Sequence, residues 1–223
     1  MRQVAEEVFQ LPLSPRSSVN AYLLGDVLVD AGYRLQAGRV LAAVRGRVVS
    51  RHVLTHAHVD HAGGSRKVVD TLGVPVFGSE RDLPSLRSGE ATMEVPGPLR
   101  RLSAIYAGFP ALPEAQPLAI GSEVGPGFVV LDTPGHTVGH ISLWRERDRV
   151  LVCGDVINSM HLLTTRPGIQ EPPAVFTPDP ARNRESIRAL AALEPHVVLV
   201  GHGPPVIDAS GPLRAFADAL PAD

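Results

Sequence analysis

One short segment of this chain concentrates metal-binding side chains. Its sequence is Thr55-His56-Ala57-His58-Val59-Asp60-His61, with Gly63-Gly64 just behind it. Imidazole nitrogens and carboxylate oxygens are the ligands that borderline divalent metal ions prefer. Packing alone does not hold four such groups together, because they would repel one another or lack partners unless a cation neutralised them. The segment therefore predicts a metal site, and more than one metal ion.

The candidate ligands of the whole chain share a position, because each follows a predicted strand. These strands and the residues after them are Val48–Leu54 with the histidine segment, Phe128–Asp132 with His136, Val150–Cys153 with Asp155, and His196–Val200 with His202. Side chains that leave strand ends meet at one edge of a sheet, where a rigid scaffold holds the loops. The candidate ligands are therefore His56, His58, Asp60, His61, His136, Asp155 and His202.

Strands and helices alternate in the rest of the chain. The apolar patterns predict further strands over Val19–Leu24, Val27–Asp30, Pro75–Phe77 and Ile141–Trp144, and helices over Leu35–Val44, Ser65–Leu72, Ala181–Leu193 and Pro212–Leu220. Proline and glycine are dense from Asp82 to Gly127, so we expect irregular structure there with some short strands. Neither flank of that stretch looks complete alone, which predicts one domain over residues 1–223.

Composition narrows the class of protein. The formal net charge is −2 at pH 7, which gives no electrostatic case for nucleic acid or an anionic membrane as a partner. The single cysteine, Cys153, cannot form an internal disulfide, and the N-terminus lacks the pattern of a signal peptide. No apolar stretch approaches the ~20 residues that span a membrane. We expect a cytoplasmic protein that acts on a small molecule.

The number of candidate ligands fits two divalent metal ions. Two such ions need roughly six to eight donors between them, and a bridging carboxylate supplies two at once. The candidate ligands therefore leave coordination positions open for water. Zinc is preferred on ligand type, and iron and manganese take the same ligands.

The order of the motifs resembles that of the metallo-β-lactamase superfamily. His56 to His61 match its His-x-His-x-Asp-His signature, and Thr133-Pro134-Gly135-His136, Gly154-Asp155 and Gly201-His202-Gly203 resemble its later motifs. The resemblance covers most of the chain, from Asn20 to about His202, and the motifs in this order are highly specific. It implies an α/β fold, an αββα sandwich of two mixed sheets flanked by helices.

The resemblance also implies how the ligands divide between two ions. One ion is expected on His56, His58 and His136, the other on Asp60, His61 and His202, with Asp155 bridging both. Asp30, in Val29-Asp30-Ala31-Gly32, matches an acidic position of the family that supports the ligands from behind.

A site of this kind implies hydrolysis. A metal-bound water loses a proton near neutral pH, and a hydroxide that bridges two ions can attack a carbonyl carbon. One ion then holds the developing oxyanion. Asp60 is placed to orient the nucleophile and to pass a proton to the leaving group, which makes it the expected catalytic residue. The expected substrates are esters, thioesters or lactones.

Departures from named members of the superfamily narrow the substrate. True β-lactamases of this fold generally lack the bridging aspartate, which is Asp155 here. Glyoxalase II enzymes share all seven ligands but add a helical C-terminal domain that holds glutathione, and only 20 residues follow Gly203 in this sequence. Acyl-homoserine-lactone lactonases place a tyrosine shortly after the bridging aspartate, where this chain has Val156-Ile157-Asn158. We expect a glyoxalase II-like metallohydrolase without the glutathione-binding domain.

Two other functions remain as alternatives. Persulfide dioxygenases of the superfamily are similar in size and motifs, and they use one iron bound by residues that match His56, His136 and Asp155. The complete second ligand set favours the dinuclear hydrolase over this iron enzyme. The third alternative is a ligand-binding or regulatory protein with a slow metal site, and the intact ligand set argues against it.

Other polar and aromatic residues carry weaker expectations. A role in supporting the ligands and a purely structural role are equally weighted for His140, and a plain loop position is favoured for His161. We expect structural roles for His52, His196, Cys153 and Trp144, and no substrate contact for Tyr22, Tyr33, Tyr106 and Arg166.

Substrate choice is expected to rest on the two irregular stretches, residues 82–127 and 158–180. Exposed apolar side chains of the second stretch suit a lid or a homodimer contact, and they are Leu162, Leu163, Val175 and Phe176.

Overall fold

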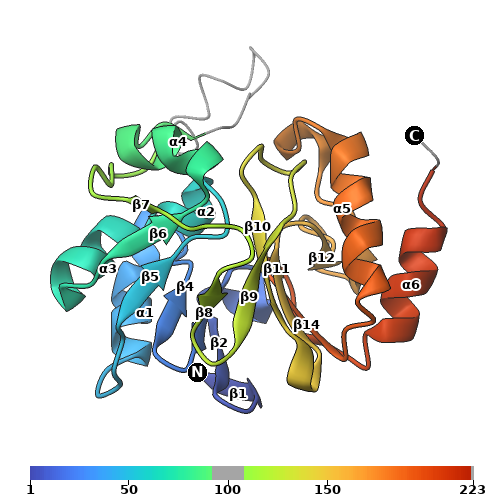
Figure 1. Cartoon of the computed structure of the whole chain (residues 1–223), viewed down its shortest axis with the longest axis horizontal. Coiled ribbons are helices and arrows are strands. Elements are labelled where there is room, and N and C mark those ends of the chain that lie inside the picture. Colours follow the sequence, from blue (N-terminus) through green and yellow to red (C-terminus); the bar gives the residue numbers. More distant parts are fainter. Residues whose placement is uncertain (92–107, 222–223) are drawn as a thin grey trace.

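Two β-sheets lie face to face in the computed structural model of this chain, with helices on both outer sides (Figure 1). The structure describes residues 1–91 and 108–221. The first sheet has seven strands there, in the order β1 (Arg2–Ala5), β2 (Val8–Pro12), β3 (Asn20–Leu24), β4 (Val27–Val29), β5 (Arg51–Val53), β6 (Val76–Gly78) and β7 (Gln116–Pro117). Its pairing is antiparallel from β1 to β4 and parallel from β4 to β7.

The second sheet is also mixed. Its strands follow the order β15 (Val206–Ile207), β14 (Val197–Val200), β11 (Val150–Gly154), β10 (Ile141–Arg145), β9 (Phe128–Asp132) and β8 (Glu123–Val124). Only the β11–β14 pair is parallel among these described strands. The predicted αββα sandwich of two mixed sheets is therefore confirmed.

Alternate residues of the second sheet pack on its two faces. In β11, Val150 and Val152 belong to the core between the sheets, while Leu151 and Cys153 belong to the core beneath the C-terminal helices. Successive side chains of a strand point to opposite faces, so a continuous apolar run is what a strand buried on both sides requires. Cys153 is a buried core residue, as predicted.

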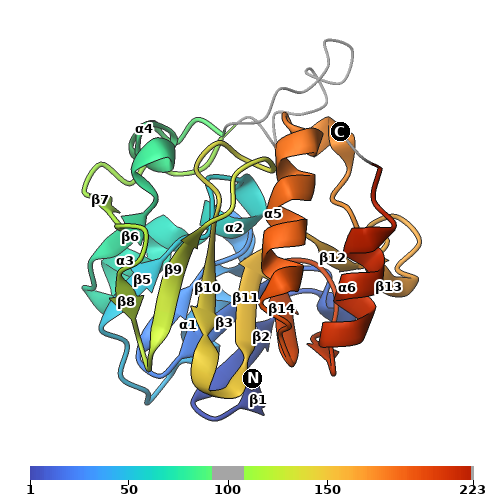
Figure 2. The ribbon, with the colours of Figure 1, turned by 45° about the vertical axis from the view of Figure 1, so that its right-hand side comes forward.

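Helices cover the outer face of each sheet. Residues of α1 (Ala37–Ala43) and α3 (Ser65–Leu72) join the core on the first sheet. On the second sheet α5 (Pro180–Ala192) and α6 (Ser210–Asp218) lie side by side (Figure 2). Helix α5 begins one residue before the predicted Ala181. The Asp179 side chain caps it by accepting a hydrogen bond from the Arg182 N–H, and Pro180 occupies the first turn.

Three local expectations are corrected by the structure. Strand β5 is shorter than the predicted Val48–Leu54, because Val48 lies at the surface, 77% exposed, outside the sheet. The stretch expected to be irregular contains the helix α4 (Leu83–Ser88), which has Pro84 in its first turn and is followed by Gly89 with a positive φ. The loop after Asp155 contains a hairpin of β12 (Asn158–Met160) and β13 (Pro167–Gln170).

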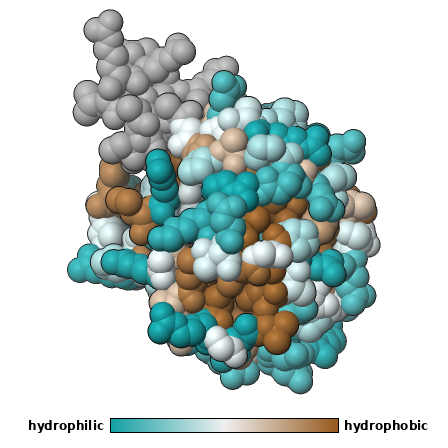
Figure 3. All heavy atoms as spheres, turned by 90° about the vertical axis from the view of Figure 1, so that its left-hand side faces the viewer, coloured by the Kyte–Doolittle hydropathy of each residue, from teal (hydrophilic) through white to brown (hydrophobic). Residues whose placement is uncertain are grey.

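The side of the molecule that carries α3 shows an apolar area framed by hydrophilic side chains (Figure 3). In the described part of the chain no helix combines the length and the apolar character needed to cross a bilayer.

The ends of the central strands of both sheets meet at one edge of the sandwich. The loop after β5 accepts a hydrogen bond from the start of β10, with Ile141 N donating to Thr55 O at 2.9 Å. The loop after β14 contacts β3, with Asn20 N donating to Gly201 O at 3.0 Å. All predicted ligands lie on these loops or directly beside them.

Candidate metal centre

The histidine segment turns from a strand into a short helix. Residues 54–58 follow β5, and α2 (Val59–Ala62) then carries Asp60 and His61 on one turn. The glycines behind it allow close backbone packing, because a Cβ at Gly63 would lie 2.7 Å from Arg34 N. The segment is therefore fixed against residues 31–34 of the first sheet's edge.

Three histidines from the two sheets form a first cluster, which we call the three-histidine group: His56, His58 and His136. One ring nitrogen from each lies within 4.8 Å of the others. The closest pair is His136 Nε2 and His58 Nδ1, 3.0 Å apart. All three side chains are buried.

A second cluster, the mixed group, contains one carboxylate and two imidazoles: Asp60, His61 and His202. Their ligand atoms also lie within 4.8 Å of one another, and His202 Nε2 is 3.2 Å from Asp60 Oδ2. The Asp60 side chain keeps 17% of its surface exposed, more than the 7% of His202.

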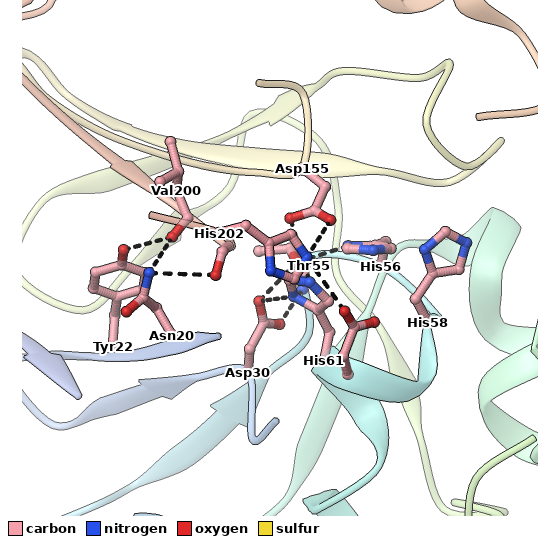
Figure 4. A network of polar contacts seen from close by, with 12 residues as sticks. Asn20, Tyr22, Asp30, Thr55, His56, His58, His61, Asp155, Val200 and His202 are labelled. Carbon is pink, nitrogen blue, oxygen red and sulfur yellow. Dashed lines mark hydrogen bonds and ion pairs between the residues drawn. The ribbon is translucent and has the colours of Figure 1, made fainter. Parts of the chain in front are cut away.

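Asp155 lies between the two groups (Figure 4). Its Oδ2 is 3.0 Å from His202 Nε2 and 3.5 Å from His136 Nε2, and its Oδ1 is 3.3 Å from His61 Nε2. One carboxylate thus reaches a nitrogen of each group, which is the position expected of a bridging ligand. The structure brings together all seven residues that the sequence singled out.

Several buried atoms of these residues have no hydrogen-bond partner among residues 1–91 and 108–221. They are His56 Nε2, His58 Nε2, His61 Nε2 and Asp155 Oδ1. A buried polar atom without a partner is costly, and in native proteins such atoms are normally hydrogen-bonded or bind an ion. These imidazole nitrogens and carboxylate oxygens converge and lack hydrogen-bond partners, so they are suited to bind divalent cations.

The two groups differ in their affinity for protons. Burial lowers the pKa of His56, His136 and His58, that of His58 to about 4, so these imidazoles are neutral at pH 7. Burial also opposes a charge on His202, but the neighbouring Asp155 and Asp60 carboxylates raise its pKa to about 10. Burial opposes a charge on His61 as well, yet Asp155 and Asp30 raise its pKa well above the ordinary value.

Asp30 orients two residues of the histidine segment. Its Oδ2 lies 2.7 Å from His61 Nδ1 and accepts from Thr55 Oγ1 at 2.8 Å, while its Oδ1 accepts from Thr55 N. The residue has a φ of 58°, a left-handed conformation that an aspartate tolerates better than most residues. It therefore stands directly behind the ligands, where the resemblance placed it.

The other ligands are held by uncharged partners. His136 Nδ1 lies 3.1 Å from Thr177 Oγ1, and His202 Nδ1 lies 2.6 Å from the backbone oxygen of Ser18. Partners of this kind fix the orientation of the ring and leave the other nitrogen for the metal.

His140 supports Asp155 through the backbone. Asp155 N donates to His140 Nε2 at 3.1 Å, and His140 Nδ1 lies 2.9 Å from Thr133 Oγ1. Burial lowers the pKa of His140 to about 3, so it is the neutral acceptor that this contact needs. Of the two roles weighed for His140, the structure favours support of a ligand.

Three supporting residues were missed by the sequence analysis: Asn20, Asp82 and Thr177. Asn20 Nδ2 donates to the backbone oxygens of Ser17, Val200, Gly201 and Gly203 and so holds the loop of His202 (Figure 4). A buried polar residue at the start of an apolar strand is a signal that could have pointed to it.

The remaining expectations concern residues outside the ligand set. His52 is structural, with contacts to Leu28 O and Ser65 Oγ, whereas His196 is exposed beside Asp208. Tyr22 is buried and donates to Val200 O at 2.7 Å. Tyr106 lies outside the described residues.

A pocket opens onto the ligands. Its volume is about 360 Å³, and His58, Asp60, His136, Asp155 and His202 line its floor. Leu162, Leu163 and Phe176 line it from the loops after Asp155, and Tyr33 lies on the first-sheet side. Tyr33, for which no substrate contact was expected, therefore borders the pocket.

Known proteins match this chain over most of its length. A family model described as the metallo-beta-lactamase superfamily matches residues 14–202. The chain is 33% identical to "Probable metallo-hydrolase YflN" of Bacillus subtilis, over 92% of this chain and 82% of that protein. It is 31% identical to a hydroxyacylglutathione hydrolase of Methylococcus capsulatus, over 68% of this chain and 52% of that protein, so the match spans about half the length of that hydrolase.

Solved structures share the fold. The structure of TTHA1623 in a di-iron-bound form has a TM-score of 0.69 at 28% identity, over 91% of this chain and 96% of that one. The metallo-β-lactamase Rm3 has a TM-score of 0.69 at 21% identity, over 96% and 89%. The family model, the relatives and the ligand geometry agree, and this chain belongs to the metallo-β-lactamase superfamily.

Proposed function

We propose that this protein is a dinuclear metal-dependent hydrolase that cleaves an ester, thioester or lactone of small size. The observation that carries the proposal is the convergence of the three-histidine group and the mixed group on Asp155, at the floor of a pocket. The relatives named as metallo-hydrolases support it.

Two divalent ions, bound as proposed, would supply an activated water and an electrophile for the carbonyl oxygen. The three-histidine group would hold one ion, the mixed group the other, and the Asp155 carboxylate would bridge them. Zinc suits these donors, and the di-iron form of TTHA1623 supports iron as an alternative occupant.

Asp60 is the proposed proton carrier. Of the two carboxylates in the candidate ligand set it is the more exposed, and it lines the pocket. Burial would raise its pKa, but the hydrogen bond with His202 lowers it below the ordinary value, so Asp60 is ionised at pH 7. Its carboxylate can accept a hydrogen bond from the attacking water, take up the proton that this water loses and pass that proton to the leaving group.

The pocket supports a small substrate. Its volume of about 360 Å³ is near the lower end of ordinary ligand sites. Leucine and phenylalanine side chains on one wall suit an apolar acyl group, and the serine and tyrosine hydroxyls on the other wall suit a polar one.

The test combines metal content with a panel of esters, thioesters and lactones, on protein purified without a metal-binding tag. We expect about two divalent ions per chain and turnover of a member of the panel. Asp60→Asn should lower kcat by about 10²–10⁴-fold, and His58→Ala should remove activity together with the ion of the three-histidine group. His196→Ala, at an exposed histidine that does not line the pocket, is the matched control.

Full activity of His58→Ala at normal metal content would overturn the proposal. About one iron per chain with little other metal, and oxygen consumption with persulfides, would favour the iron dioxygenase instead. Metal-restored binding of a ligand without turnover would favour the regulatory protein.

A further inference from the structure

Asp82 is a buried carboxylate that does not belong to the candidate ligand set. It ends the short helix η3 (Glu80–Asp82) after β6, and 1% of the residue is exposed. It stands at the start of α4, yet its side chain makes no capping hydrogen bond there. Within residues 1–91 and 108–221 it forms no ion pair. The carboxylate is therefore available for another purpose.

Among the described residues, the three hydrogen bonds of the Asp82 side chain all go to the two loops that carry the three-histidine group. Asp82 Oδ2 accepts from Ala57 N at 3.0 Å and from Thr137 Oγ1 at 3.1 Å. Asp82 Oδ1 accepts from Gly139 N at 3.1 Å. Ala57 lies between His56 and His58, and Thr137 directly follows His136 in the sequence.

The two loops come from different sheets. His56 and His58 follow β5 of the first sheet, and His136 follows β9 of the second. The Asp82 carboxylate thus joins the two halves of the sandwich within two residues of each histidine. Gly139 is required for this approach, because a Cβ there would lie 2.5 Å from Asp82 Oδ1 and 2.6 Å from Ser79 Oγ.

A carboxylate is the side chain that this position needs. Three donors point at its two oxygens, and a carboxylate accepts hydrogen bonds without offering a donor. An asparagine of the same shape would have only one acceptor oxygen. Its amide nitrogen would face either Gly139 N–H or the Ala57 N–H, placing a donor against a donor.

In the described part of the chain, no hydrogen bond joins Asp82 to a residue next to Asp60, His61 or His202. His61 is held by Asp30, and the loop of His202 is held by Ser18 O and Asn20. None of these contacts involves residues 57, 137 or 139. Loss of the Asp82 carboxylate should therefore loosen one group and leave the other intact.

We propose that Asp82 is a positioning residue that fixes the spacing of His56, His58 and His136 across the two sheets, and so sets the metal affinity of the three-histidine group alone. The inference rests on the proposed function, because it concerns the metal that this group would hold.

The test measures zinc affinity in two backgrounds, each with one group left complete. His202→Ala leaves the three-histidine group complete, and His58→Ala leaves the mixed group complete. Metal-free full-length protein is titrated with Zn²⁺ in competition with a chromophoric chelator. Asp82→Asn should weaken binding by about 10–100-fold in the His202→Ala background, as expected for a residue behind the ligands. It should leave binding unchanged in the His58→Ala background.

A matched control and a milder variant guard the test against general loss of structure. Asp148→Asn removes a carboxylate that accepts two hydrogen bonds from Arg145, at the opposite end of β10 from the ligands, and should leave both affinities unchanged. Thr137→Val keeps the shape of the side chain and removes one hydrogen bond to Asp82, so it should reduce the same affinity by a smaller factor.

The role of Asp82 would be overturned if Asp82→Asn weakened zinc binding equally in both backgrounds. It would also be overturned if neither Asp82→Asn nor Thr137→Val weakened zinc binding in either background. If the single variants His202→Ala and His58→Ala and the unmodified chain bind no zinc or iron, the proposed function itself fails. If the unmodified chain binds two ions and Asp82→Asn binds both with the same affinity, only this inference fails.

Discussion

The three-histidine group and the mixed group lie side by side but differ in the chemical type of the side chains behind their histidines. Behind His56 and His136 stand the hydroxyls of Thr55 and Thr177. Behind His61 stands the carboxylate of Asp30. A carboxylate that accepts from a ligating histidine makes the imidazole a stronger donor than a hydroxyl does. The difference indicates that one centre is built from a neutral half and an anionic half.

The direction of the pKa shifts follows the same division. Burial lowers the pKa of every histidine in the three-histidine group, and it outweighs the carboxylates that raise the pKa of His58 and His136. Carboxylates raise the pKa of both histidines in the mixed group against the effect of burial. The neutral half is thus ready to bind a cation at pH 7, whereas the anionic half must first release protons.

Asp155 is where the comparison is tested most severely, because its two oxygens approach nitrogens of both halves. We expect Asp155→Ala to lower the affinity for each of the two metal ions by more than about 100-fold. This loss exceeds the one expected from removing a residue behind the ligands. Metal content after dialysis against a chelator, measured by mass spectrometry, checks this. Retention of one ion at unchanged affinity would show that Asp155 serves only one group.

The supports behind the ligands give a smaller and selective effect. Asp30→Asn should lower the affinity of the mixed group for its ion by about 10–100-fold, because a charge-assisted hydrogen bond to His61 is replaced by a neutral one. Thr177→Val removes a neutral contact of His136 and should lower the affinity of the three-histidine group for its ion by a smaller factor. Stepwise zinc titration of both variants distinguishes the ions, and a larger effect of Thr177→Val would reverse the comparison.

The ligands themselves could be predicted from the sequence, for a physical reason. Histidine and aspartate in a tight cluster after an apolar strand have few uses other than metal binding, and strand ends place them at one edge of the sheet. His136, Asp155 and His202 were found by this rule although they lie far from the histidine segment in the sequence.

The supports could not be predicted, because nothing local distinguishes them. Asp82 meets Ala57 across 25 residues and Gly139 across 57, and Asn20 meets Val200 across 180. An aspartate in a proline- and glycine-rich stretch looks like a turn residue until the two sheets are in place. The first residue of β5 could not be predicted from local sequence either, because only packing decides that Val48 stays exposed.

The pH dependence of metal binding tests the same comparison without a change to the residues behind the candidate ligands. Below pH 10 the metal-free protein carries a proton on His202, which a metal ion must displace, so affinity of the mixed group should rise with pH by about tenfold per unit for each proton released. The pKa of His58, at about 4, lies below this range, and the three-histidine group should bind with the same affinity from pH 6 to pH 9. Zinc titration of the His202→Ala and His58→Ala proteins over that pH range separates the two halves.

The zinc affinity of His202→Ala should not change with pH, and that of His58→Ala should rise with pH. If the two affinities changed with pH in parallel, the two halves would share their protons, and the division into a neutral and an anionic half would be wrong.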